Sequence, residues 1–405
     1  MILILKITCR RIRQYSFVVL AVAAACSGRL SRPDSGVEPV LPDGGATVTR
    51  AAVVGAAADC AVLSAKEFRD AVATLKTATA TFAGSGSAAD RQAARESFHV
   101  AFDAWQVNEV LQFGPSAPST MPGGLDMRDQ IHSWPLVSRC AMEQALVAKS
   151  YEGGVSSMLV NQRGLPALEY LLFYEGDDTA CDATSPIVTQ GTWAAMTSVE
   201  RASRRRAYAA QVALDVHGRA SELVAQWENG FKVSMATAGN GSALFPTTQA
   251  ALNTVTDALF YVETAMRDAK LARPLGLRDC AAAPCLDQLE SPYAGRSKRN
   301  IAYNLIGVRR VIMGCEADGS GIGFDDLLVS VGAQTTAQQL EASVASAQAA
   351  VTAIDEPDLK DALIADPASV RALYDAMKGI TDRLKTDFLT VLDLERPSSL
   401  ETDND

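Results

Sequence analysis

Apolar side chains recur at intervals of three and four residues along most of this chain, the spacing of one face of an α-helix. The pattern predicts a first helix over residues 60–81 and a second over residues 89–111. The second helix is expected to stop where Phe113-Gly114-Pro115 interrupts the pattern. The stripe of the first helix consists of Val62, Leu63, Phe68, Val72 and Leu75, and that of the second of Phe98, Phe102, Trp105 and Val110.

The remainder of the chain follows the same helical spacing, apart from residues 114–135, which are predicted to form a loop. Further helices are predicted over residues 192–231, 247–272, 297–313, 334–354 and 367–393. The sequence carries no hairpin or βαβ pattern. We therefore predict an all-α protein with two helical-bundle-like halves, over about residues 55–185 and 186–395.

Composition agrees with a folded helical body. Of the 405 residues, 48% are hydrophobic and 21% are charged, which is typical of a globular chain. The formal net charge is -10, and the first 25 residues hold basic but no acidic side chains, so the rest is more acidic still. Because nucleic-acid binding needs a basic face, a nucleic-acid partner is not expected.

The N-terminus is typical of an export signal. A basic stretch is followed by an apolar run over residues 17–25, too short to span a membrane, so residues 1–25 are predicted to be a signal peptide. Cys26 follows three alanines and precedes Ser27-Gly28, which resembles the site at which bacterial lipoproteins are cleaved and acylated, although Ala23 stands where leucine is usual. The alternative is ordinary cleavage after an Ala-x-Ala site, which would leave a soluble periplasmic protein.

Domain boundaries follow from these features. Residues 26–54 are predicted to be a lipidated cysteine and flexible linker, residues 55–395 the helical domain, and residues 396–405 a disordered tail. Six cysteines remain in the exported part, and an even number suggests disulfides. Cys280 with Cys285, Cys140 with Cys181, and Cys60 with Cys315 would complete one set, but the sequence alone leaves all 15 pairings open.

Residues 163–173 are the most informative segment. Gly164 and Pro166 mark a helix start, since proline is tolerated in the first turn. Glu169 follows on the same face within an apolar stretch, so it needs a hydrogen-bonding or charged partner if it is buried. An exposed or capping glutamate is the alternative.

This segment resembles the motif of the imelysin family, written GxHxxE and followed by Tyr/Phe-Leu-Leu. Three further stretches are similar to that family in the expected order, and together they cover about residues 55–395. They are Trp105 to Pro115, Glu290 to Ser297 leading to Asn304, and Gly321 to Leu328. The resemblance implies an all-α fold with two bundle-like halves and the motif near their junction. The family includes an insulin-cleaving membrane protease, iron-regulated envelope proteins and domains of ferrous-iron uptake systems.

The family pattern implies a metal site, because a histidine and a glutamate three residues apart on a helix can face one ion. Here Pro166 stands at the histidine position and offers no lone pair, and Glu169 alone is a weak transition-metal ligand. The three histidines, His99, His132 and His217, are read as structural or loop residues. The acids Glu175, Asp177, Asp178, Asp325 and Asp326 suit a hard cation but are more simply explained as solvated loop residues.

The resulting prediction is a membrane-anchored, non-catalytic lipoprotein of the cell envelope that binds a metal ion such as iron or zinc, a small ligand or a protein partner in iron acquisition. An imelysin-type metallopeptidase and a structural lipoprotein without ligand are the alternatives. Glu169 is expected to pair with an arginine or tyrosine across the junction of the halves. The candidate site residues are Arg163, Gly164, Pro166, Glu169 and Tyr170 from the motif, and Tyr293, Arg296 and Asn304 from the second half.

Overall fold

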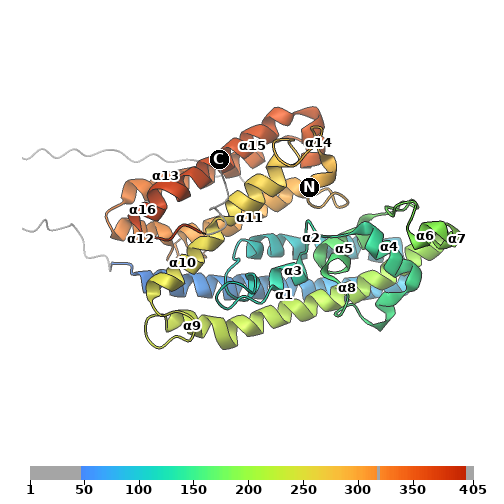
Figure 1. The fold of residues 1–405 in the computed structure, drawn as a ribbon, viewed down its shortest axis with the longest axis horizontal. Coiled ribbons are helices and arrows are strands. Elements are labelled where there is room, and N and C mark those ends of the chain that lie inside the picture. The colour runs from blue at the N-terminus through green and yellow to red at the C-terminus, as the bar shows by residue number, and fades with distance from the viewer. Residues whose placement is uncertain (1–46, 317–319, 398–405) are drawn as a thin grey trace, which may run out of the picture. The chain divides into compact units, whose positions relative to one another are not determined.

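The computed structural model describes residues 47–316 and 320–397. Every regular element in these ranges is helical, so the predicted all-α class is confirmed. Three long helices, α1 (Arg50–Ser85), α2 (Ala88–Glu109) and α8 (Ser198–Gln226), run side by side in Figure 1 and pack on one another through α1. The signal peptide, Cys26 and most of the predicted linker and tail lie outside the described residues.

Helix α1 begins earlier than the apolar pattern indicated. Thr49 caps it by accepting a hydrogen bond from the Ala52 amide, so the helix starts inside the range assigned to the linker. It ends at Gly86, which has a φ of 63° and turns the chain into α2. Buried alanines and valines line much of its inner face, which lets neighbouring helices pack closely.

The segment between α2 and α8 is built from short helices. The predicted loop over residues 114–135 is wrong in part, because it contains a 3₁₀ turn and one short helix whose apolar residues are too few to show a period. The elements are η1 (Gly114–Ser116), α3 (Met127–Ile131), α4 (Arg139–Ala148), η2 (Ser150–Gly153), η3 (Val160–Gln162), α5 (Gly164–Phe173), α6 (Pro186–Thr189) and α7 (Thr192–Ala195).

The predicted helix over residues 192–231 is interrupted at Thr197, which caps α8 by accepting from the Glu200 amide. It then continues through the π-helical segment η4 (Trp227–Phe231) into α9 (Lys232–Ala236). The helix predicted over residues 247–272 divides into α10 (Thr248–Leu259) and the π-helical η5 (Val262–Ala272). The described residues from Thr47 onward form one compact unit, and the division into halves stays a prediction.

The C-terminal helices pack together beside η5, as Figure 1 shows. Helix α11 lies against α2, and at Gly307 a side chain would approach the Val107 carbonyl oxygen to 2.5 Å, so glycine permits this close crossing. The elements are α11 (Ser297–Met313), α12 (Phe324–Ser330), α13 (Gln334–Thr352), α14 (Leu359–Ala365), α15 (Pro367–Arg383), η7 (Leu384–Phe388) and α16 (Leu389–Val391), with a 3₁₀ turn η6 (Leu286–Gln288) before α11.

The three disulfides among the described residues form the one set named from the sequence, out of the 15 pairings that it left open. Cys60 is bonded to Cys315, Cys140 to Cys181, and Cys280 to Cys285. The first of these ties α1 to the end of α11 across 255 residues of sequence. Such long-range closure restricts the unfolded chain more than the short loop between Cys280 and Cys285 does.

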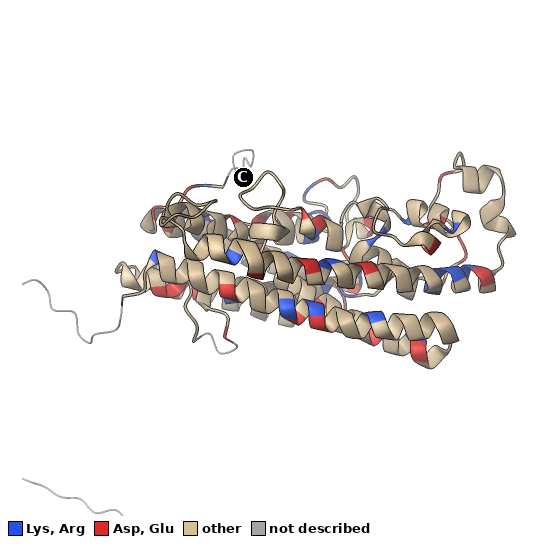
Figure 2. Ribbon diagram, turned by 90° about the horizontal axis from the view of Figure 1, so that it is seen from below, with Lys and Arg blue, Asp and Glu red and all other residues tan. Residues whose placement is uncertain are grey.

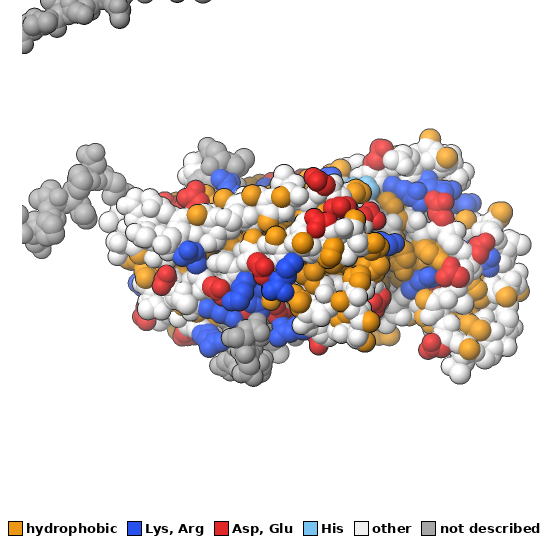
Figure 3. Space-filling view, turned by 90° about the horizontal axis from the view of Figure 1, so that it is seen from above, with side chains coloured by type: hydrophobic (Ala, Val, Ile, Leu, Met, Phe, Trp, Pro, Cys, Tyr) orange, Lys and Arg blue, Asp and Glu red, His pale blue; other side chains and the backbone are white. Residues whose placement is uncertain are grey.

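Charged side chains of both signs are interspersed along the helices and over the surface (Figures 2 and 3). This is typical of solvated helix faces. Within the described residues, no helix combines the length and the apolar character that crossing a membrane requires.

Candidate functional site

The site is organised around the start of α5. Gly164 has a φ of 80°, and a side chain there would lie 2.6 Å from the Ile131 carbonyl oxygen, so this position requires glycine. Pro166 occupies the first turn, where no amide hydrogen is needed. Because α5 is buried almost along its whole length, Glu169 is carried into the interior.

Glu169 is only 2% exposed. Its Oε1 atom accepts hydrogen bonds from the backbone amides of Tyr293 and Ala294, each at 2.8 Å. The prediction that Glu169 pairs with an arginine or tyrosine side chain is therefore wrong, because both of its hydrogen-bond donors are backbone amides. Burial raises the pKa of Glu169 to about 7, although the two amide hydrogen bonds act in the opposite direction.

A cavity of about 240 Å³ lies over this carboxyl group, and we call it the Glu169 cavity. Its lining joins four chain segments: the loop before α4, α4 itself, the first turns of α5 and the loop over residues 287–293. The side chains that matter for ligand chemistry are Trp134, Arg139, Glu169, Asp287 and Tyr293. His132 and Glu290 form part of its inner wall.

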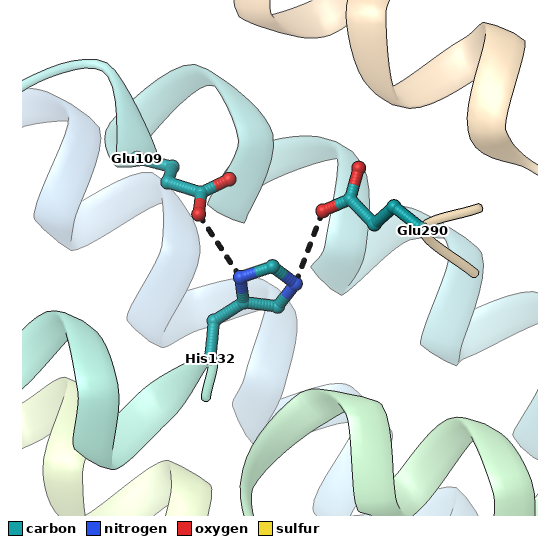
Figure 4. A group of neighbouring side chains, drawn as sticks. All are labelled: Glu109, His132 and Glu290. Carbon is teal, nitrogen blue, oxygen red and sulfur yellow. Dashed lines mark hydrogen bonds and ion pairs between the residues drawn. The ribbon is translucent and has the colours of Figure 1, made fainter. Parts of the chain in front are cut away.

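Behind that wall, three ligand-type side chains converge in the core. Figure 4 shows His132 between Glu109 and Glu290. The His132 Nδ1 atom lies 2.9 Å from Glu109 Oε1, and Nε2 lies 3.1 Å from Glu290 Oε1. The first contact is an aligned hydrogen bond, whereas the second is close enough for an ion pair but poorly directed for a hydrogen bond. All three side chains are buried.

Lys270 completes this group from η5. Its Nζ atom lies 3.2 Å from Glu109 Oε2 and 3.0 Å from Glu290 Oε2. It also donates to Gln106 Oε1 at 2.8 Å and to Asn304 Oδ1 at 2.9 Å. The ammonium group is thus surrounded by four oxygen atoms while only 2% of its side chain is exposed.

The electrostatics of the group are those of a compensated ion cluster. Burial opposes ionisation of Glu109, but Lys270 and His132, with Arg128, hold its pKa well below the usual range. Burial likewise opposes ionisation of Glu290, yet Lys270 and His132 lower its pKa to about 2. Burial alone would lower the pKa of His132, but the two carboxylates raise it. The carboxylates beside its two ring nitrogens therefore favour the imidazolium form of His132.

The structure separates the other predicted site residues. Asn304 reaches the cluster through Lys270, and Tyr293 borders the Glu169 cavity. Arg163, expected at the site, instead pairs with Asp215 at 3.2 Å, because its position before α5 turns it toward α8. Tyr170 donates to Glu143, a buried residue of α4, at 3.1 Å.

Arg296 also binds other side chains and does not contact Glu169. Its guanidinium group binds Asp103 at 2.6 Å and Asn300 at 2.7 Å, and it lies 3.0 Å from His99 Nδ1. Burial and the charge of Arg296 lower the pKa of His99 to about 4, so this histidine is neutral and serves the packing of α2 against α11. Arg296 influences Glu169 through its charge rather than by contact.

Four of the five acidic loop residues considered for a hard cation have partners; the exception is Asp325, whose Oδ1 atom is buried without a hydrogen bond to any described residue. Glu175 binds Arg91 and Arg95, Asp177 binds Arg201, and Asp178 binds Arg139. Asp326 accepts from the Gly323 amide and caps α12. These contacts favour the structural explanation of the acids.

Comparison with known proteins decides the family. The imelysin family model matches residues 61–386, most of the chain. The chain belongs to the imelysin family. It is 24% identical over 288 residues to iron-regulated protein A of Synechococcus elongatus, covering 70% of this chain and 69% of the relative.

Two solved structures share the imelysin fold. A protein described as an iron-regulated protein A precursor from Parabacteroides distasonis has a TM-score of 0.66 at 17% identity, covering 87% of this chain and 97% of the other. An imelysin-like protein from Psychrobacter arcticum has a TM-score of 0.63 at 18% identity, covering 85% and 96%. At these identities the likeness shows the fold alone.

The metal that the imelysin motif implies does not fit the residues of this imelysin-family protein. Pro166 supplies no lone pair at the motif histidine position. The spatial substitute would be His132, whose ligand atoms and those of Glu109 and Glu290 lie within 4.8 Å of one another. However, His132 is doubly engaged and Lys270 already fills the space between the carboxylates at ammonium distances, so the cluster holds its own cation.

Glu109, Lys270 and the role of His132 could not be identified from the sequence. Glu109 lies inside one imelysin-like stretch, and Lys270 interrupts a predicted apolar helix face, so each carried a weak signal. No signal in the sequence indicated the role of His132, because its partners come from α2 and from the loop before α11, far away in sequence.

Proposed function

We propose that this imelysin-family protein is an exported, lipid-anchored and non-catalytic protein of the bacterial cell envelope that binds a small organic cation in the Glu169 cavity. The observation that carries the proposal is a buried carboxyl group, facing a cavity, that is held only by two backbone amides. Among the described residues, neither Glu169 nor Asp287 at the rim makes an ion pair with a basic side chain. A ligand with an ammonium or guanidinium group would supply the missing charge.

The walls of the cavity suit such a ligand. Trp134 and Tyr293 offer aromatic surfaces, which attract cations through their π systems. Arg139 also lines the cavity, but its guanidinium group is engaged by Glu143 and Asp178 and stacks over Tyr174 at 4.0 Å. A volume of about 240 Å³ admits a small molecule rather than a folded partner.

The metal-ligand side chains of the site support a non-catalytic role. A metallopeptidase needs an ion with an open position that activates water. Here the available histidine is held between two carboxylates, and Lys270 lies where such an ion would bind. The Synechococcus relative is named iron-regulated protein A, and we extend regulation by iron to this chain as part of the proposal.

Anchoring in the membrane rests on Cys26. In a bacterial host, the wild-type protein is expected to fractionate with membranes, because the two acyl chains of the diacylglyceryl group on the cysteine hold a lipoprotein there. Cys26→Ser should move it to the soluble periplasmic fraction, as judged by immunoblotting of the fractions. A wild-type protein that is already soluble would instead favour ordinary signal-peptide cleavage.

Cation binding should depend on pH through Glu169. Only the ionised carboxylate attracts a cation, and its pKa of about 7 means that ionisation rises between pH 6 and pH 8. The affinity for putrescine or guanidinium, measured by titration calorimetry, is therefore expected to increase over that range. Glu169→Gln should weaken binding about tenfold or more and remove the pH dependence. Asp287→Asn should weaken binding less, because that carboxylate is exposed.

Other outcomes of the same titrations assign the site differently. Stoichiometric binding of Fe²⁺ or Zn²⁺ that is lost in His132→Ala but kept in Glu169→Gln would make the Glu109–His132–Glu290 group a metal site, the second candidate. Peptide cleavage that depends on Glu169 would make the protein an enzyme. If neither cations nor metals bind, the protein is a structural lipoprotein.

A further inference from the structure

A second hollow, of about 300 Å³, lies away from the Glu169 cavity, where the turn after α1, the first turns of α2, the end of α5 and the start of α8 meet. Four arginines line it, Arg91 and Arg95 from α2 and Arg205 and Arg206 from α8, and we call it the arginine pocket. Buried apolar side chains, including Phe82 and Leu172, form part of its wall.

The charges of the arginine pocket do not balance. Its two acids are Glu175, which binds Arg91 and Arg95, and Asp177, which is engaged by Ser198 and by Arg201 outside the pocket. Among the described residues, Arg205 and Arg206 make no ion pair with a carboxylate. The pocket therefore carries excess positive charge in a chain whose formal net charge is -10.

Arg205 and Arg206 bond only to backbone carbonyl oxygens. Arg205 donates to the carbonyls of Tyr174 and Gly176, and Arg206 to that of Ala83 at 3.3 Å. Arg205 is 4% exposed, and its Nε atom has no hydrogen-bond partner in the protein. Arg205 lies over the Tyr174 ring at 5.1 Å and attracts Asp177 only through space, since that carboxylate pairs with Arg201. A buried guanidinium with no carboxylate in direct contact is costly, which favours a pocket built for negative charge.

The Glu175 carboxylate occupies the position that an acidic group of a ligand would take. Its Oε1 atom lies 3.0 Å from Arg91 and 2.6 Å from Arg95, as a ligand carboxylate would. Yet 59% of its side chain is exposed, so it can swing into solvent at little cost and leave both arginines free.

From this arrangement we propose that the arginine pocket binds a small organic anion with two acidic groups, each a carboxylate or a phosphate, which displaces Glu175 and neutralises Arg205 and Arg206. One acidic group replaces the Glu175 carboxylate between Arg91 and Arg95. The second reaches the α8 arginines, and the carbon skeleton lies against the apolar wall. The competing explanation is that the arginines only cap the carbonyls at the end of α5.

The test is titration calorimetry of the full-length protein with succinate, citrate and inorganic phosphate, at constant ionic strength maintained with sodium chloride. The wild-type protein is expected to bind at least one of the three saturably. Glu175→Gln removes the competing carboxylate and should tighten binding about tenfold. Preference for phosphate over the carboxylates, or the reverse, identifies the acidic group.

Arg206→Gln should weaken the same binding about tenfold, since it removes a charge-assisted contact. Arg206 makes only one long backbone hydrogen bond, so its loss should leave folding intact, which circular dichroism verifies. Arg371→Gln, at an exposed pair with Asp375 on α15, is the matched control and should bind as the wild type does. The proposal is overturned if neither the wild type nor Glu175→Gln binds any of the anions, or if Arg206→Gln leaves the affinity unchanged.

Discussion

Lys270→Met is expected to lower the free energy of unfolding by about 3–5 kcal/mol, the cost of removing one partner from a buried ion cluster. The substitution keeps most of the side-chain volume but leaves Glu109 and Glu290 without the ammonium that lies within 3.2 Å of both. It also leaves the oxygens of Gln106 and Asn304 without their donor. Denaturant unfolding followed by circular dichroism measures the loss.

The same variant tests whether Lys270 acts as the cation of the cluster or only fills space in the core. With Lys270 gone, the donor atoms of Glu109, His132 and Glu290 remain within 4.8 Å of one another, a spacing that Zn²⁺ can bridge. We therefore expect Zn²⁺ to raise the unfolding midpoint of Lys270→Met but not that of the wild type, because a ligand of the folded state stabilises it. The double variant Lys270→Met/His132→Ala should lose this response.

A matched control is Lys378→Met, which removes an exposed lysine paired with Asp382 on α15. Its effect on stability should stay below about 1 kcal/mol, and it should not respond to Zn²⁺. Stoichiometric Zn²⁺ binding by the wild type that is lost in Glu109→Gln would contradict the interpretation, since it would mean that Lys270 gives way to metal.

The helical architecture was largely predictable because the signals for helices are local. The segment 297–313 was predicted with the ends that α11 has, since apolar spacing and the glycine at 314 both lie in the sequence. The interruption at Thr197 and the π-helical turns were not predicted, because an apolar stripe continues through both. The earlier start of α1 was missed because alanines give a weak apolar pattern.

Site residues could be predicted only where the residues next to them in the sequence indicated their surroundings in the fold. The apolar helix around Glu169 left open a partly buried, paired side chain or an exposed or capping one, and the structure shows it buried. Its partners could not be predicted, since backbone amides of Tyr293 and Ala294 have no sequence signature. Lys270 and His132 acquire their roles through contacts between distant segments, and only the fold reveals these.

Glu169→Gln is expected to make the stability of the protein less dependent on pH. The ordinary pKa of 4.5 applies in the unfolded chain, whereas burial raises the pKa to about 7 in the folded protein. Between these values the unfolded chain releases the proton first, so the folded state of the wild type loses stability as pH rises. The accumulated loss by pH 8 is about 3 kcal/mol, at 1.36 kcal/mol per pKa unit.

Glutamine stays neutral at every pH and can still accept the amide hydrogen bonds of Tyr293 and Ala294 through its carbonyl oxygen. The variant should therefore exceed the free energy of unfolding of the wild type by less than about 1 kcal/mol at pH 5 and by about 3 kcal/mol at pH 8. Denaturant titrations at the two pH values measure the difference, with the exposed Glu341→Gln as the control for losing a carboxylate. An equal difference at both pH values would show that Glu169 is ionised throughout. A gain in stability at pH 8 would mean that the protein keeps a destabilising carboxylate facing its cavity, as expected of a residue retained for binding rather than for folding.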